Sequence, residues 1–317
     1  MAFKDIKGHQ QPLRILQEHM RHQRLANGYL FVGPEGLGKH LTARTLAKAV
    51  NCQAGSVDSC DICPSCRKID AYQHPDVLFV ADTDEVVKIE QVRQLQQRIS
   101  LKPYEARRKV CVIDNAHHLT AEAANALLKV LEEPPAESLI ILVSAKPTLL
   151  FKTIVSRCRA VTFSPLERAE LAKILQSEYG LRDEAARFLA YFSEGRIGQA
   201  LRLKDGDILG EKNRVLDAFF SSGREGQLSL EDKSRLRGYL NILATWFRDM
   251  SLVKIGMPHS ELINYDRRSD LLGSMQQYSF GDIDEIVVCI SNSILYLEQN
   301  VNIKLLLSNL RAELTRI

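Results

Sequence analysis

The sequence predicts an α/β fold, in which a parallel β-sheet is covered by helices and a long helical region follows. Three short apolar runs, at 28–32, 109–113 and 138–143, have the length and composition of buried parallel strands. Helical patterns separate these runs, and alternation of strands with helices favours a parallel sheet. No segment after residue 164 has comparable strand character.

Amphipathic patterns predict the helices that accompany these strands. Residues 11–24 carry apolar side chains at helical spacing, and a helix is expected over about 39–50, after a glycine-rich loop. Apolar positions recur along one face of a helix over 89–99. A further helix over 120–133 begins at a threonine N-cap and ends at two prolines.

The domain organisation follows from where the strand signals stop. Ser164–Glu167 has the form of a capping box with proline at the first helical position, so a helix is expected to begin there. We therefore expect an α/β domain over 1–165, a small domain of two or three helices over 166–205, and an all-helical domain over 206–317. A break in the last domain is expected at 221–223.

Composition excludes several classes of protein. The 317 residues are 45% apolar and 26% charged, which is typical of a globular chain and unlike collagen, mucins or disordered proteins. No run of 18 apolar residues exists, and the N-terminus lacks the apolar core of a signal peptide, so we expect a cytoplasmic protein without a membrane partner. The net charge of +3 does not indicate a nucleic-acid-binding protein.

A glycine-rich loop is the first candidate site. The segment 33–40 fits the phosphate-loop pattern G-x-x-x-x-G-K and departs from it at His40, where a serine or threonine is expected. Backbone N–H groups of such a loop surround phosphates. The missing hydroxyl would coordinate Mg²⁺, for which imidazole is a poor substitute. We expect a weakened phosphate-binding loop, with nucleotide-binding candidates Gly33, Gly36, Gly38 and Lys39.

The strand over 109–113 ends in a second candidate, Asp114. In ATPases with such a strand an Asp-Glu pair follows: the aspartate helps to hold Mg²⁺, and the glutamate activates water. Here Asn115 takes the place of the glutamate, and an amide does not accept a proton at neutral pH. Together with His40, this removes a metal ligand and a base from one site, which argues against ATP hydrolysis and leaves at most weak ATP binding.

Four of the seven cysteines are clustered in the pattern C-x7-C-x2-C-x2-C, at Cys52, Cys60, Cys63 and Cys66. Four thiolates brought together by tight turns suit tetrahedral Zn²⁺, and four ligands leave no open position, so the predicted zinc is structural. An iron–sulfur cluster is the alternative. The fourth ligand of a ferredoxin-type run would fall at Asp70, so zinc is favoured.

Two further segments carry a family resemblance. Asn125–Pro135 and Ile154–Cys158 resemble the subunits of bacterial clamp loaders, which are AAA+ proteins of the DNA polymerase III holoenzyme. The resemblance covers 1–205 well and implies a RecA-like AAA+ domain with a zinc module inserted at 52–66. It also implies a helical lid domain and an all-α collar domain that serves oligomerisation, the latter over 206–317.

The departures from the family pattern distinguish two types of subunit. Both the ATP-hydrolysing gamma/tau type and the non-hydrolysing delta-prime type share the zinc excursion. His40, Asn115 and the absence of the family's sensor 2 arginine, whose position falls on Gly198, favour the delta-prime type. The alternatives are a gamma/tau-like ATPase and a zinc-dependent DNA-binding module. Turnover of ATP by the chain alone would indicate the first, and zinc-dependent DNA binding the second.

The segment Ser156-Arg157-Cys158 matches the family's Ser-Arg-Cys motif, whose arginine serves the ATP site of the neighbouring subunit. The resemblance therefore implies that Arg157 acts as an arginine finger in trans. It also implies gamma/tau and delta subunits as partners, and contact with the sliding clamp and primed DNA through the complex.

Overall fold

The computed structural model divides the chain into two compact units, each described here by itself. The first contains Met1–Glu167 together with Arg196–Gln199, and the second contains Arg168–Gly195 together with the chain from Ala200 onward. The break predicted at 221–223 lies outside the described residues. The described residues are 1–55, 57–80, 86–220, 233–299, 301–303 and 305–306.

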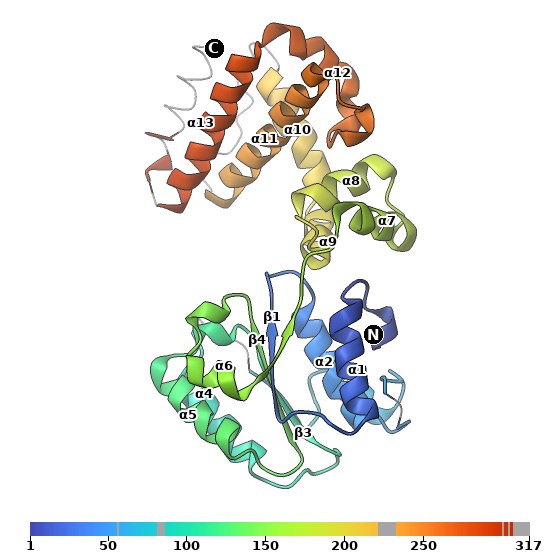
Figure 1. Ribbon diagram of the computed structural model, residues 1–317, viewed down its shortest axis with the longest axis vertical. Helices are drawn as coiled ribbons and strands as arrows, with labels where there is room; N and C mark the ends of the chain where they lie inside the picture. Colours follow the sequence, from blue (N-terminus) through green and yellow to red (C-terminus); the bar gives the residue numbers. More distant parts are fainter. Residues whose placement is uncertain (56, 81–85, 221–232, 300, 304, 307–317) are drawn as a thin grey trace. The chain divides into compact units, whose positions relative to one another are not determined.

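The first unit is a five-stranded, wholly parallel sheet in the order β2-β3-β4-β1-β5, with helices on both faces (Figure 1). This confirms the predicted α/β class with a parallel sheet covered by helices. The strands are β1 (Gly28–Val32), β2 (Val77–Val80), β3 (Lys109–Ile113), β4 (Ser138–Ser144) and β5 (Arg159–Thr162). The helices are α1 (Gln10–Arg21), α2 (Lys39–Asn51), α3 (Pro64–Asp70), α4 (Ile89–Ile99), α5 (Ala121–Glu132) and α6 (Lys152–Arg157).

The three central strands, β1, β3 and β4, have apolar side chains on both faces, which explains why the sequence predicted them. Tyr29 and Phe31 of β1 pack in a core with α1 and α2, whereas Leu30 packs in a second core with α4 and α5. Successive side chains of a strand point to opposite faces, so a strand that is covered on both faces is continuously apolar. The predicted strands 28–32 and 109–113 coincide with β1 and β3, and the prediction for β4 is one residue short.

The sequence did not predict the edge strands β2 and β5. Each has only four residues. β2 is apolar throughout but is only partly buried beyond Val77, and in β5 only Val161 is buried. The helix expected after β5 is present, but its predicted start in the Ser164–Glu167 capping box is wrong, because α7 begins at Arg168. Phe163 still donates its N–H to the Val32 carbonyl of β1, at 2.7 Å, so the chain has not yet left the sheet.

The second unit is helical, with α11 packed against α10, α12 and α13. Its division into a lid over 166–205 and a collar over 206–317 stays a prediction. None of the helices in the described part of the chain meets the length and apolarity that crossing a bilayer requires. The helices are α7 (Arg168–Tyr179), α8 (Asp183–Phe192), α9 (Ile197–Asp205), α10 (Ile208–Phe220), α11 (Lys233–Ile255), α12 (Arg268–Ser274) and α13 (Phe280–Glu298).

One buried carboxylate fixes the loop that leads into β3. Asp76 is 2% exposed, and its carboxylate accepts hydrogen bonds from the backbone N–H groups of Tyr104, Glu105 and Ala106 at 2.8–3.0 Å. Burial by itself would raise the pKa of Asp76, but these hydrogen bonds outweigh it and hold the pKa below its usual value. The charged carboxylate of Asp76 therefore positions the loop that leads into β3, the strand that Asp114 follows.

Asp76→Asn keeps the shape of the side chain but removes its charge. We expect the variant to lose about 1.5–3 kcal/mol of unfolding free energy at pH 7. The folded-state pKa of Asp76 lies below the unfolded value, so this contribution is present above the unfolded pKa of about 3.9 and disappears as the pH falls through the folded-state pKa. Urea unfolding of both proteins between pH 7 and pH 3 should show the difference shrinking towards acid.

The matched control is Glu285→Gln, an exposed carboxylate on α13. Its unfolding free energy should follow that of the unmodified protein across the range. A difference for Asp76→Asn that stays constant or grows on acidification would contradict the assignment.

Candidate functional site

The structure brings the predicted phosphate-loop residues together at the end of β1. Gly33, Gly36 and Gly38 have φ values of +146°, +78° and +82°, a region that favours glycine. These conformations curl the chain between Val32 and the first turn of α2, which begins at Lys39. The arrangement is that of a phosphate-binding loop at a helix N-terminus.

The ammonium group of Lys39 is turned into this loop. Lys39 is 6% exposed, and its Nζ donates to the carbonyl oxygens of Gly33 at 2.5 Å and Pro34 at 2.6 Å. Burial lowers the pKa of Lys39, and the carboxylates of Asp114 and Glu35 oppose this effect. Two of the three ammonium N–H groups are thus used within the loop.

His40 contacts the acidic end of β3 directly. Its Nδ1 lies 3.0 Å from Oδ2 of Asp114, and its Nε2 lies 3.2 Å from the hydroxyl of Tyr72. Burial would raise the pKa of Asp114, but the contact with His40 and the N–H of Asn115 outweigh it and hold the pKa low. An imidazole thus contacts the carboxylate that in an active site would help to hold Mg²⁺.

The sensor 2 position also lies against the phosphate loop. Gly198 belongs to the short segment of α9 that clusters with the first unit, and its N–H donates to the Gly36 carbonyl at 2.8 Å. A Cβ atom at residue 198 would lie 2.8 Å from that same oxygen. An arginine at this position would therefore require the loop to shift.

The four clustered cysteines converge. Their Sγ atoms all lie within 4.8 Å of one another, and tetrahedral zinc with bonds of about 2.3 Å holds its ligands about 3.8 Å apart. The N–H groups of Ile62 and Cys63 lower the pKa of Cys60 to about 6, whereas burial raises the pKa of Cys66. The donor set could hold a metal ion: Cys52, Cys60, Cys63 and Cys66.

A buried lysine ties the cysteine segment to the core. Lys48 of α2 is 1% exposed, and its Nζ lies 2.6 Å from Asp61 and 2.8 Å from Asp70. Despite burial, the two carboxylates hold the pKa of Lys48 above its usual value. Asp70, the position at which a fourth ferredoxin-type cysteine would fall, is thus an ion partner of Lys48.

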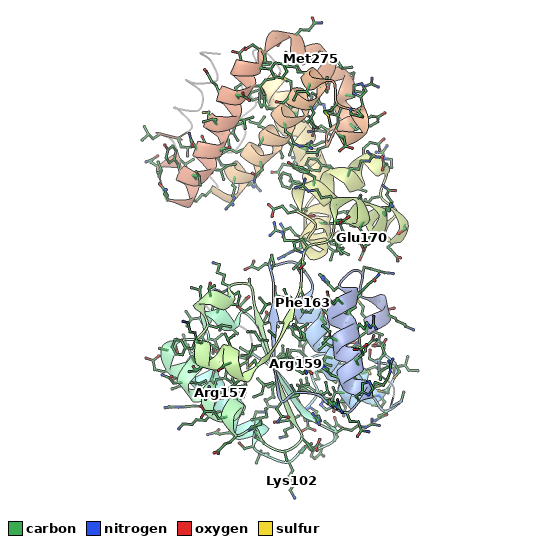
Figure 2. All side chains as sticks on the ribbon, viewed as in Figure 1. Lys102, Arg157, Arg159, Phe163, Glu170 and Met275 are labelled. Atoms are coloured by element: carbon green, nitrogen blue, oxygen red, sulfur yellow. The ribbon has the colours of Figure 1, made fainter. Side chains whose placement is uncertain are left out.

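Arg157 lies at the opposite end of the sheet from the phosphate loop. It ends α6 just before β5, and Arg159 of β5 pairs with Tyr29 near the start of β1. The loop begins at Gly33, after the other end of β1. At 3.3 Å per residue, Gly33 lies about 13 Å along the strand from Tyr29. Figure 2 shows Arg157 and Arg159 away from Phe163, which lies beside the end of β1.

The Ser-Arg-Cys motif has specific contacts inside the chain. Arg157 Nη2 lies 2.8 Å from Oε1 of Glu132, and Nη1 donates to the Thr153 carbonyl at 3.0 Å. The hydroxyl of Ser156 donates to the same carbonyl at 3.1 Å. Burial raises the pKa of Cys158 to about 12, so its thiol stays neutral and packs in the core. Sequence reasoning did not identify Glu132 as a partner of Arg157, although both lie in motifs that it singled out.

The parallel sheet and the glycine-rich loop at the end of β1 define an α/β protein with the loop shape of nucleotide-binding folds. The family described as "DNA polymerase III, delta subunit" matches residues 8–167, which is half of the chain. The chain belongs to this family, among the DNA polymerase III clamp-loader proteins.

Three curated relatives show how far the likeness extends. The DNA polymerase III subunit delta' of Bacillus subtilis is 29% identical over 94% of this chain and 93% of its own length. The subunit tau of Bacillus subtilis is 32% identical over 73% of this chain, and that of Escherichia coli is 34% identical over 76%. The chain spans only 44% and 36% of these two tau subunits.

Among solved structures, a gamma subunit-related protein of DNA polymerase III from Thermotoga maritima aligns over 96% of this chain and 99% of its own. The identity is 19% and the TM-score is 0.43.

The loop geometry predicts different costs at two of its glycines. In Gly33→Ala the new Cβ would collide with the Phe163 carbonyl oxygen, at a φ that alanine rarely adopts. In Gly38→Ala the φ is also positive, but no atom lies within 4 Å of the new Cβ. We expect unfolding free energies lower by about 2–3 kcal/mol for the first and about 1 kcal/mol for the second, measured by urea unfolding. Equal losses would contradict this description of the loop.

Proposed function

We propose that this chain is a non-hydrolysing clamp-loader subunit of the delta-prime type, which supplies Arg157 to the ATP site of a neighbouring subunit. The observation that carries the proposal is an intact Ser-Arg-Cys motif at the end of the sheet remote from the chain's own phosphate loop. A guanidinium supplied in trans stabilises the charge of the transferring phosphoryl group, an effect of about 10³–10⁵ in rate.

The chain's own nucleotide site supports the non-hydrolysing part of the proposal. Position 40 offers an imidazole in contact with Asp114 instead of a hydroxyl for Mg²⁺, and position 115 offers an amide instead of a base. Lys39 and Gly198 both have partners within the loop. We expect weak nucleotide binding at this site and no hydrolysis.

The assembly is proposed by likeness to the relatives. The chain would work beside gamma/tau and delta subunits, and the complex would place a sliding clamp on primed DNA. ATP bound to the neighbouring subunit would then be hydrolysed with the help of Arg157, so the state of that ATP would be coupled to clamp loading.

The cysteine cluster is proposed as a structural zinc site. Four thiolates would complete a tetrahedral shell and leave no position for water. The ion pairs of Lys48 with Asp61 and Asp70 position the segment on α2, which explains how the cluster would stabilise the first unit.

Arg157→Ala tests the central proposal in a complex reconstituted with gamma/tau and delta subunits. We expect hydrolysis at the neighbouring site to fall by about 10³-fold or more, and clamp loading to fall with it. DNA-stimulated ATPase and clamp-loading assays measure both, after gel filtration has shown that the complex assembles.

A suitable control is Arg14→Ala, because Arg14 is an exposed arginine on α1 with its own ion pair to Glu18. Unchanged ATPase and loading with Arg157→Ala would refute the arginine-finger role. If the purified chain alone turned over Mg-ATP and lost this activity in Lys39→Ala, the gamma/tau-like alternative would replace the proposal.

The metal proposal predicts about one zinc ion per chain by elemental analysis, and no iron. Cys63→Ser should lower both the zinc content and the thermal midpoint, because a structural zinc contributes its binding energy to folding. Cys289→Ser on α13 is the control and should keep the zinc. A metal-free protein with an unchanged thermal midpoint would contradict the structural role.

A further inference from the structure

The guanidinium of Arg157 is held by its own chain. Glu132 is the last residue of α5 and Arg157 the last residue of α6, and these two helices contact each other. Both terminal nitrogens of Arg157 have internal partners: Nη2 lies 2.8 Å from Glu132 Oε1, and Nη1 lies 3.0 Å from the Thr153 carbonyl. At least one N–H group on each terminal nitrogen is thus engaged within the chain.

This ion pair borders a cavity of about 450 Å³ at the end of the sheet where β1 begins. Arg157 and Arg159 both line this cavity. Among the described residues that line it, Glu132 is the only acidic one. Two guanidinium groups favour an anion in this space, and the carboxylate opposes one.

A carboxylate and a phosphoryl group compete for the same planar donor face of an arginine. Because Glu132 Oε1 lies 2.8 Å from Nη2, a phosphoryl oxygen that approached the same nitrogen would meet a like charge. The two anions cannot both hold the guanidinium without mutual repulsion. The Arg157 and Glu132 side chains are 36% and 48% exposed, and ion pairs of such exposure are weak enough to be displaced.

We infer that Glu132 holds Arg157 in a withdrawn position, from which the phosphoryl group of a nucleotide on the neighbouring subunit displaces it. Glu132 is a positioning residue in this scheme, because it acts on the nucleotide only through Arg157. The inference rests on the proposed function of Arg157. It adds that Glu132 competes with the nucleotide of the neighbouring subunit for the Arg157 guanidinium.

Glu132→Gln tests the inference, because it preserves the size of the side chain and removes its charge. In the complete reconstituted complex we expect the neighbouring site to bind the slowly hydrolysed analogue ATPγS about two- to fivefold more tightly. This is the factor that corresponds to the usual strength of an exposed ion pair. Glu133→Gln is the matched control, because Glu133 is the next residue, is exposed, and forms no ion pair with Arg157 in the described contacts.

A double-mutant cycle separates this effect from a structural one. In the Arg157→Ala background, Glu132→Gln should leave ATPγS binding unchanged, since no guanidinium remains to be released. Unchanged or weaker binding in Glu132→Gln alone, or equal tightening in both backgrounds, would overturn the inference.

The outcomes also distinguish the two proposals. If Arg157→Ala impairs ATPase and Glu132→Gln behaves like the unmodified protein, only the role of Glu132 fails. If Arg157→Ala itself changes neither ATPase nor ATPγS binding, the proposed function of Arg157 fails.

Discussion

The parallel direction of β1 and its neighbours is the constraint on which the rest of the structure depends. Because β1, β4 and β5 run in the same direction, the segments that follow these strands lie at one end of the sheet. The segments that precede the strands lie at the opposite end. The phosphate loop follows β1, and Arg157 precedes β5. One chain therefore carries the altered glycine-rich loop at one end of the sheet and Arg157 at the opposite end, and the proposed function in trans depends on this separation.

The residues that depart from an active ATP site form their own set of contacts. His40 contacts Asp114, Gly198 donates to Gly36, and Lys39 donates to the loop carbonyls. The side chains of Lys39 and Asp114, which in an active subunit would meet phosphate and Mg²⁺, thus have partners inside the chain. These contacts and the glycine conformations hold the loop in the shape of a phosphate-binding loop although the residue types at positions 40 and 115 differ from those of an active site.

The parts of the fold that the sequence did not predict depend on pairing between strands that are far apart in the sequence. Central strands such as β1 are buried on both faces, so their continuous apolarity identifies them, whereas the edge strand β5 buries only Val161. Ser164–Glu167 has the residues of a capping box, but the hydrogen bond from Phe163 to Val32 keeps the chain extended up to that segment. Local preference was overridden by a strand pairing between residues far apart in the sequence.

The sequence by itself determined the α/β class, the family resemblance and the residue types at each candidate site, because these depend on local periodicity and on short motifs. It could not decide which side chains meet. That Asp70 pairs with Lys48, that the His40 imidazole reaches Asp114, and that Glu132 holds Arg157 are contacts between segments 22 to 74 residues apart. Only the packing of the helices on the parallel sheet brings such groups within hydrogen-bonding distance, so the contacts at each end of the sheet are decided by the tertiary structure.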